Sequence, residues 1–435
     1  MPYSILSLDG GGTWALIQAR VLVKRYGPDK KGHEILKEYN LVIANSGGSL
    51  VLSMLCANKT TQQIVDTFNN TNVLQAIFKK KFINHIPKLR DFLPRFDTEN
   101  KYEVFVEHLK NDGISYGEKL LTQLPGLIGT PCPEIIITCF DYDRERAVYF
   151  RSNMGSHMES SYIENKVEPN SATDVFKTVT LAQAVHGASN APVQFFDDPA
   201  AFPPTEPDAQ GNPPHVNPKK RRLYWDGAVG GNNNPVKAGV LEAIANSVDR
   251  NVRRSEIHVV SIGTSNTVQP ILYGESGECQ PEYDWLCRVS EIDNWQKDLS
   301  RMANSVLCDP PDAASFDAHQ LLDLDYKQKD VRFIRINPLI KPILKNKPDA
   351  PKDGWYMPGV AGNWTPEKMK DLFTMDMAIS SQYGVDLINQ LCEDYFAGGF
   401  DNQGIRLGGK KMDAILGHKK FNEALEDWKA WDNLP

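Results

Sequence analysis

The chain has 435 residues, of which 41% are hydrophobic and 24% are charged, and its net charge is −7. This composition can bury a large core in one elaborate domain or in two or three ordinary ones, and it argues against a disordered, collagenous or repeat protein. The acidic balance argues against a nucleic-acid binder, because such proteins need a basic face.

The cysteines and the first residues of the chain indicate in which cellular compartment the protein is expected. The seven cysteines show no CxxC spacing, and an odd number in a long chain predicts neither a disulfide framework nor a zinc module. The opening residues lack the regions of a signal peptide, and no apolar run reaches the roughly 18 residues of a membrane span. We therefore expect a cytoplasmic protein, with or without peripheral membrane contact, that uses no cofactor or metal; its oligomeric state stays open.

In chain order, apolar runs alternate with helical patterns. Tyr3–Leu8 predicts a buried strand, Trp14–Lys24 a helix, Tyr39–Ala44 a second strand and Leu50–Cys56 a second helix. Further strands are predicted at Glu134–Phe140, Ala147–Phe150, Arg222–Trp225, Ile257–Ile262 and Val331–Ile336. The alternation predicts an α/β fold with a mostly parallel central sheet.

Two proline-containing segments interrupt this pattern, Asp197–Pro218 and Leu339–Pro366. Strand-like or helical signal resumes after each, so we expect surface covers rather than linkers between domains. We expect one α/β domain over residues 1–338, and a loop-rich and helical C-terminal extension over residues 339–435 that packs on the same domain.

Three of the predicted strands end in residues with reactive or anion-binding chemistry, and such loops gather at the carboxyl ends of the strands in a parallel sheet. The first is Asp9-Gly10-Gly11-Gly12. Consecutive glycines let backbone N–H groups point into one concavity, which suits an oxyanion or a phosphate equally well. A tight turn without any ligand is the alternative.

The second loop, Ala44-Asn45-Ser46-Gly47-Gly48, fits a nucleophile elbow, a strained turn that exposes a serine between a strand and a helix. Small residues are needed two before and two after the serine, and Ala44 and Gly48 occupy these positions. The third loop begins with Asp226, whose carboxylate could take the serine proton if partial burial raises its basicity. Taken singly, each of these residues is more often structural.

In combination, the loops resemble the patatin-like phospholipase family, whose pattern is DGGG, then GxSxG, then DGG or DGA. The resemblance spans roughly Ser4 to Pro338. Three further segments are similar to the family's later stretches: Ala184–Phe196, Ser261–Ser265 and Phe333–Pro338.

This resemblance implies a three-layer α/β/α sandwich and a serine hydrolase that cleaves acyl esters of lipids, of the phospholipase A or the lipase and esterase type. Ser46 would be acylated, and Asp226 would accept its proton and later activate water. The backbone amides of Gly10, Gly11 and Gly12 would form the oxyanion hole. Asp9 is then expected to anchor the glycine loop. None of the histidines matches a family position, so His186 is expected to pack rather than to catalyse.

Two departures from the family pattern stand out. Thr13 is followed by Trp14 where the family usually has Arg or Lys, which questions a strict phospholipid preference, and Ala44 replaces the first elbow glycine. Two alternatives stay open, and these departures motivate the first. One is a patatin-like lipid-binding or effector module with impaired catalysis. The other is an ATP-binding protein of the actin and sugar-kinase type, whose phosphate loops also read like DGGGT.

One basic segment, defined here as residues 77–96, interleaves six lysines and arginines with large apolar side chains. Such a pattern suits peripheral contact with an anionic lipid surface. A solvated amphipathic cover of the core is the alternative.

Overall fold

A computed structural model gives the fold of the chain. It describes residues 2–80, 95–153, 179–192, 195–202, 205–206, 215–216, 222–245, 252–267, 313–323, 331–344, 355–357, 364–406 and 415–433.

The centre of the fold is an eight-stranded sheet in the order β13-β11-β1-β2-β5-β10-β7, with β6 paired to β5 off this path. Its strands are β1 (Tyr3–Leu8), β2 (Leu41–Ala44), β5 (Glu134–Asp141), β6 (Arg146–Arg151), β7 (Ala200–Phe202), β10 (Arg222–Asp226), β11 (Ile257–Ile262) and β13 (Phe333–Ile336). The five strands from β13 to β5 are parallel to one another, whereas β6 and β10 run antiparallel to β5.

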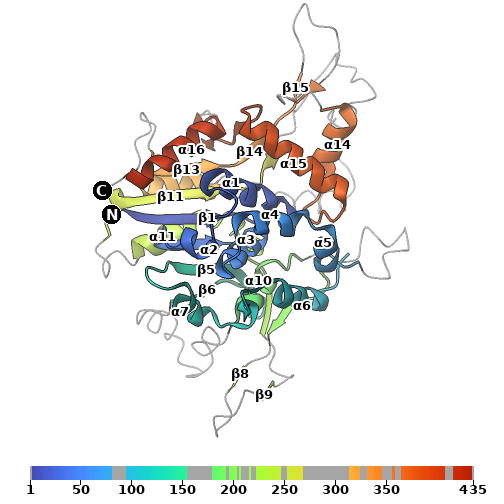
Figure 1. Cartoon of the computed structure of the whole chain (residues 1–435), viewed down its shortest axis with the longest axis vertical. Helices are drawn as coiled ribbons and strands as arrows, with labels where there is room; N and C mark the ends of the chain where they lie inside the picture. Colours follow the sequence, from blue (N-terminus) through green and yellow to red (C-terminus); the bar gives the residue numbers. More distant parts are fainter. Residues whose placement is uncertain are drawn as a thin grey trace, which may run out of the picture.

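Helices cover both faces of this sheet (Figure 1). The helices of the described chain include α1 (Leu16–Tyr26), α2 (Gly32–Leu36), α3 (Ser46–Cys56), α4 (Thr61–Asn69), α5 (Thr71–Ile77), α6 (Glu99–His108), α7 (Leu124–Ile128), α10 (Leu181–Ala188), α11 (Val236–Ala245), α14 (Pro366–Thr374), α15 (Gln382–Phe396) and α16 (Phe421–Ala430). Residues 313–321 are helical as well. Outside the main sheet, the described chain also contains a three-stranded sheet made of β12 (Asn266–Thr267), β14 (Pro338–Ile340) and β17 (Asp401–Asn402). Short two-stranded pairs are β3 (Lys110–Asn111) with β4 (Ile114–Ser115), β8 (Thr205–Glu206) with β9 (His215–Val216), β15 (Ile343–Leu344) with β16 (Trp355–Tyr356), and β18 (Ile405–Arg406) with β19 (Ile415–Leu416).

Alternation of side chains along the strands creates two apolar cores. On β1, Leu6 and Leu8 belong to one core, whereas Tyr3 and Ile5 belong to the other. The first core includes α1, α3 and α4, and the second includes α11. The chain therefore forms the three layers expected of an α/β/α sandwich.

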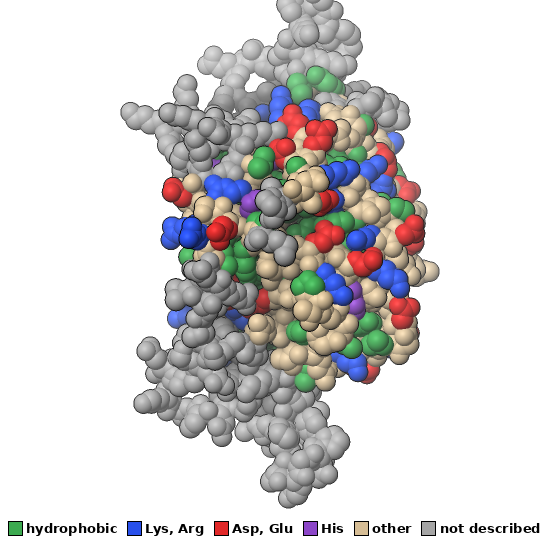
Figure 2. Space-filling model, turned by 60° about the vertical axis from the view of Figure 1, so that its left-hand side comes forward, with side chains coloured by type: hydrophobic (Ala, Val, Ile, Leu, Met, Phe, Trp, Pro, Cys, Tyr) green, Lys and Arg blue, Asp and Glu red, His purple; other side chains and the backbone are tan. Residues whose placement is uncertain are grey.

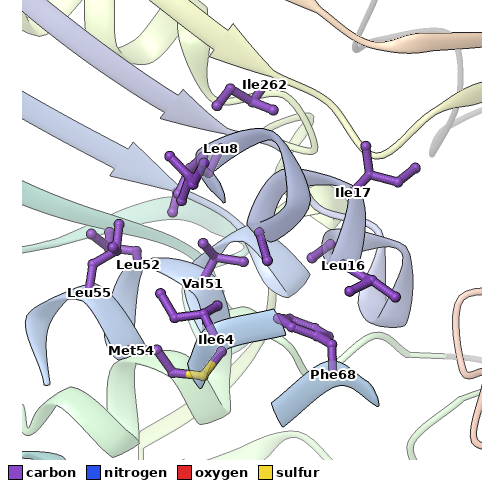
Figure 3. Close-up of a cluster of buried hydrophobic side chains, with 14 of the residues drawn as sticks. Leu8, Leu16, Ile17, Val51, Leu52, Met54, Leu55, Ile64, Phe68 and Ile262 are labelled. Carbon is purple, nitrogen blue, oxygen red and sulfur yellow. The ribbon is translucent and has the colours of Figure 1, made fainter. Parts of the chain in front are cut away.

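The first core fixes α3, the helix that begins at Ser46. Figure 3 shows side chains of α1, α3 and α4 converging below the ends of β1 and β11. Most of them are fully buried, and each aliphatic side chain of this kind contributes roughly 1.5–3 kcal/mol of hydrophobic stabilisation. The labelled members are Leu8, Leu16, Ile17, Val51, Leu52, Met54, Leu55, Ile64, Phe68 and Ile262. This packing gives the start of α3 a rigid base.

Most strand predictions agree with the structure, and β1 and β11 have the predicted bounds. One expectation was wrong. The segment Asp197–Pro218 is not only a surface cover, because its residues Ala200–Phe202 form β7, which pairs with β10 in the main sheet. The sequence also gave no sign that β10 runs antiparallel to β5.

The C-terminal helices lie against the α/β layers. Figure 1 shows α15 and α16 beside α1 and β13, and both α15 with α1 and α16 with β13 are in contact. Arg20 of α1 forms an ion pair with Glu393 of α15, and Arg25 forms one with Asp432. The division at residue 338 stays a prediction.

The described surface carries charges of both signs. On the face in Figure 2, Lys and Arg side chains alternate with Asp and Glu over the described residues. None of the described helices is long and apolar enough to cross a membrane. Residues 81–94 of the basic segment lie outside the described residues; of its ends, Lys79 and Lys80 are exposed.

Candidate active site

The site forms where β2 and β10 meet end to end along β5. Ala44 at the end of β2 pairs with Ile137, and Asp226 at the end of β10 pairs with Cys139. Since β6 occupies the opposite edge of β5, β2 and β10 share one edge and approach it from opposite directions. The residues that follow β2 therefore meet Asp226 beside Thr138.

Ser46 has the backbone conformation of a nucleophile elbow. Its φ is 45°, a strained value for a residue other than glycine, and it is the first residue of α3. Gly48 is required at this turn, because a Cβ there would lie 2.5 Å from the Leu8 carbonyl oxygen. Ala44 is fully buried at the end of β2, so its methyl group is accommodated.

The Asp226 carboxylate is buried and hydrogen-bonded. The Asn45 side-chain amide donates to its Oδ1 at 2.9 Å and the Ala228 N–H donates to the same oxygen at 2.9 Å. The Ser46 side chain lies close enough to the carboxylate to lower its pKa. Burial raises the pKa of Asp226 above its ordinary value, although these hydrogen bonds oppose the shift. The structure thus brings the two predicted residues together, with the carboxylate made more basic than a free aspartate.

Both residues are less accessible than the sequence suggested. A nucleophile elbow predicts an exposed serine and a partly buried Asp226, but Ser46 is only 5% exposed and Asp226 only 2% exposed. The tight junction of β2, β10 and the glycine loop causes this burial. A Cβ on Gly10, for example, would lie 3.0 Å from the Cβ of Ser46.

Asn45 and Thr138 support Asp226 and were missed in the sequence. The Thr138 hydroxyl donates to Asn45 Oδ1 at 2.7 Å, which leaves the Asn45 amide nitrogen directed at Asp226. The only hint was a polar residue at the end of one apolar strand and another within the next. Such residues in buried strands need partners.

The glycine loop packs against the elbow, but its three amides are not equivalent. The Gly10 N–H donates to the Asn233 carbonyl oxygen at 2.7 Å, which removes it from the predicted set of oxyanion donors. Among the described residues, none accepts a hydrogen bond from the N–H of Gly11, Gly12 or Gly47. Gly12 and Gly47 are adjacent, since a Cβ on Gly47 would lie 2.8 Å from the Gly12 nitrogen. The backbone N–H groups available to an oxyanion are therefore those of Gly11 and Gly12, together with that of Gly47.

A C-terminal segment, residues 375–381, holds this loop from outside. The Thr13 N–H donates to Met377 O at 2.9 Å and its hydroxyl donates to Ile379 O at 2.8 Å. The Trp14 indole N–H donates to Asp376 O at 3.0 Å. Trp14, which departs from the family pattern, thus anchors the loop through its indole.

Asp9 anchors the other side of the glycine loop. Arg335 on β13 donates to both of its carboxylate oxygens, at 3.0 Å and 2.6 Å, and also to Ser261 Oγ at 2.7 Å. Asp9 and Arg335 are both buried. A distant strand thus supplies a cation to the glycine loop, whereas the family usually has its Arg or Lys directly after Thr13.

A cavity of about 230 Å³ opens beside the glycine loop. Its wall combines apolar side chains, neutral polar ones and the charged residues Asp9, Arg335 and Asp376. The uncharged members include Trp14, Phe373, Met377, Thr264, Asn337 and Gln403. Gly10, Gly11 and Asn233 form the side nearest to Ser46, which itself does not line the cavity.

His186 lies away from this arrangement, buried on α10. Burial and the nearby Lys101 hold its pKa well below the ordinary value, so it is neutral. Among the described residues no group of histidine, cysteine and acidic side chains could hold a metal ion.

The α/β/α sandwich thus places a strained serine at a strand-to-helix turn, with a buried carboxylate and glycine backbone amides beside it. Residues 6–240, more than half of the chain, match the family described as "Patatin-like phospholipase". The chain belongs to the patatin-like phospholipase family, which supports lipid acyl hydrolysis as its general activity.

Among solved structures, VipD from Legionella pneumophila is similar with a TM-score of 0.30 and 12% sequence identity, over 90% of this chain and 67% of VipD. No curated protein matches the chain in sequence.

Proposed function

We propose that this protein hydrolyses acyl esters of lipids with a Ser46–Asp226 dyad. The observation that carries the proposal is the placement of Ser46, on a turn with φ of 45°, beside the buried carboxylate of Asp226, which the preceding residue, Asn45, holds by a hydrogen bond of 2.9 Å. The same placement distinguishes this proposal from an ATP-binding protein, which would have no use for a serine and a carboxylate paired in this way.

The reaction has two halves. Asp226 takes the proton of Ser46 Oγ as this oxygen attacks the ester carbonyl, and the amides of Gly11, Gly12 and Gly47 donate to the oxyanion that forms. The proton then passes to the leaving alcohol, and the acyl group stays on Ser46. In the second half, Asp226 takes a proton from water as the water oxygen attacks the acyl carbon. The bond to Ser46 Oγ then breaks, the proton returns from Asp226 to Oγ, and the fatty acid is released.

Parallel assays of short p-nitrophenyl esters, triacylglycerols and phospholipids test this function, with Ser46→Ala as the background. Labelling by a serine-directed fluorophosphonate is the second readout. A chain that turns over no ester and takes up no probe is not a hydrolase, and lipid binding without turnover would then favour the effector alternative.

The pH dependence of hydrolysis should reflect the surroundings of Asp226. A base works only when deprotonated, and burial raises the pKa of Asp226, so kcat/KM should fall on acidification at a pH above the ordinary carboxyl value of about 4. In Asn45→Ala a hydrogen bond that lowers this pKa is lost, and the acid limb should move to still higher pH. If the acid limb of the kcat/KM profile stayed in place or moved to lower pH in Asn45→Ala, the assignment of Asp226 as the base would be wrong.

The basic segment should bind lipid rather than cleave it. Each lysine near an anionic surface contributes about 1 kcal/mol, so changing Lys79, Lys80 and Lys81 to glutamine should weaken vesicle binding by roughly two orders of magnitude at low salt. High salt should shrink the difference, and turnover of a soluble short-chain ester should barely change.

The matched control changes Lys30, Lys31 and Lys37 to glutamine, which removes the same charge at a site distant in the sequence. Vesicle binding should then keep its strength. Equal losses in the two triple variants would mean that only net charge matters, and loss of soluble-ester turnover in the first would place the segment in the structural core.

A further inference from the structure

Lys101 of α6 is a lysine in an unusual place. It is fully buried, although lysine is among the residues least often found inside a protein. None of the described carboxylates forms an ion pair with it, and its Nζ instead meets the Ser189 carbonyl oxygen at 3.0 Å and Asn190 Oδ1 at 2.9 Å. Nζ also lies 3.9 Å from the centre of the Phe196 ring.

These three contacts suit an ammonium group. An ammonium has three N–H donors, and here two oxygens and one aromatic face are available to them. Burial lowers the pKa of Lys101 well below its ordinary value, whereas the Asp226 carboxylate opposes this shift. The neighbouring carboxylate thus favours the charged form that the contacts fit.

Asn190 connects this lysine to the proposed base. Its side-chain oxygen accepts from Lys101, and its backbone carbonyl accepts the N–H of Asp226 at 3.0 Å. The Asn190 amide donates to Asp198 O at 2.7 Å, so the residue is held on both sides. In Figure 1, α6 and α10, which leads to Asn190, lie side by side and are in contact.

Two further titratable groups, Cys139 and His186, interact with the pair, and both are neutral. Burial raises the pKa of the Cys139 thiol and lowers that of His186. Of the described groups that interact electrostatically with Asp226, Lys101 is therefore the cation, and Asp226 is the anion that acts on Lys101. A methionine of similar shape would fill the same space without the cost of burying a charge, which makes a purely structural role a poor explanation.

We propose that Lys101 is a positioning residue of the dyad, an inference that rests on the proposed function. Lys101 holds Asn190 against the backbone of Asp226, and it supplies the buried positive charge that keeps the base ionised. Lys101 does not touch the substrate. It acts on the reaction only through Asp226.

Three variants separate its charge from its hydrogen bonds. Lys101→Met removes both, Lys101→Gln retains a donor without the charge, and Lys101→Arg retains the charge in a different shape. Lys59→Met is the matched control, because Lys59 is half-buried, unlike the fully buried Lys101, and lies on the loop between α3 and α4.

The pH profile of kcat/KM for a soluble ester is the main readout, between about pH 5 and pH 9. Losing the cation should raise the pKa of Asp226, because the Lys101 charge lowers it. In Lys101→Met and Lys101→Gln the acid limb should move to higher pH. The loss of kcat/KM relative to the wild type should become smaller as the pH rises toward the alkaline plateau. Lys101→Arg should keep the limb near its wild-type position, and Lys59→Met should leave the profile unchanged. An even loss at all pH values overturns the proposal.

Thermal unfolding of Lys101→Met, Asp226→Asn and the double variant is a second readout that needs no activity. If the two charges interact, the double variant should lose less in Tm than the sum of the single losses. Additive losses would overturn the proposal even for a chain that hydrolyses nothing. The two proposals can also fail separately. If Ser46→Ala abolished ester hydrolysis but the Lys101 variants left the acid limb of the pH profile in place, the proposed function would stand and this inference would be wrong.

Discussion

Ser46→Ala and Asp226→Asn should each reduce ester hydrolysis by about 10⁴-fold or more, and the double variant should be little worse than either one. The reason is that the two residues act as one unit. Without Ser46 there is no oxygen to acylate, and an amide in place of the Asp226 carboxylate cannot accept the Ser46 proton.

Neither change should unfold the protein. Ser46→Ala removes a single oxygen, and asparagine keeps one acceptor for the Ala228 N–H and the Asn45 amide. Urea unfolding and near-UV circular dichroism check this. A matched control is Ser53→Ala, on the same helix and two turns away, where the serine hydroxyl donates a hydrogen bond to the Leu50 carbonyl oxygen. Near wild-type kcat in Asp226→Asn would contradict the dyad, and multiplying losses in the double variant would mean that the residues act independently.

Much of the fold could be predicted from the sequence, because its parallel strands are buried on both faces and so appear as continuous apolar runs. The bounds of β1 and β11 were predicted for this reason. The three loops could be found as well, since each is a local pattern that directly follows a strand.

The direction of β10 could not be predicted, because an apolar run reads the same in either orientation. The structure makes β10 antiparallel to β5, so Asp226 approaches the elbow from the opposite side to β2. The loops were expected to meet because parallel strands end at the same edge of a sheet. Asp226 instead reaches the site because β10 is antiparallel and ends where β2 ends.

The partners of the site were also beyond prediction, because tertiary packing brings them together. Asn45 lies 181 residues from Asp226, and Arg335 lies 326 residues from Asp9. Lys101 offered one faint signal: it precedes the buried Phe105 by four residues, so it stands on the apolar face of α6. A charged residue at a core position of a helix needs a local reason to be there.

The buried ion pair of Asp9 and Arg335 should be the most sensitive point of stability among these partners. Arg335→Met leaves the Asp9 carboxylate buried without its guanidinium, and losses of about 3–5 kcal/mol in the free energy of unfolding are typical of such a change. Urea unfolding measures the loss. Because Asp9 directly precedes the glycine loop, kcat should fall as well.

The control is Lys237→Met, which breaks an ion pair with Asp317 in which both side chains are more than 40% exposed, and it should cost no more than about 1 kcal/mol. The combination of Asp9→Leu with Arg335→Met replaces both buried charges, so it should recover much of the unfolding free energy that Arg335→Met loses. It should not recover kcat, because the glycine loop would still lack its polar anchor. If Arg335→Met cost no more than Lys237→Met, or if the combined variant were fully active, Asp9 would not anchor the loop through this pair.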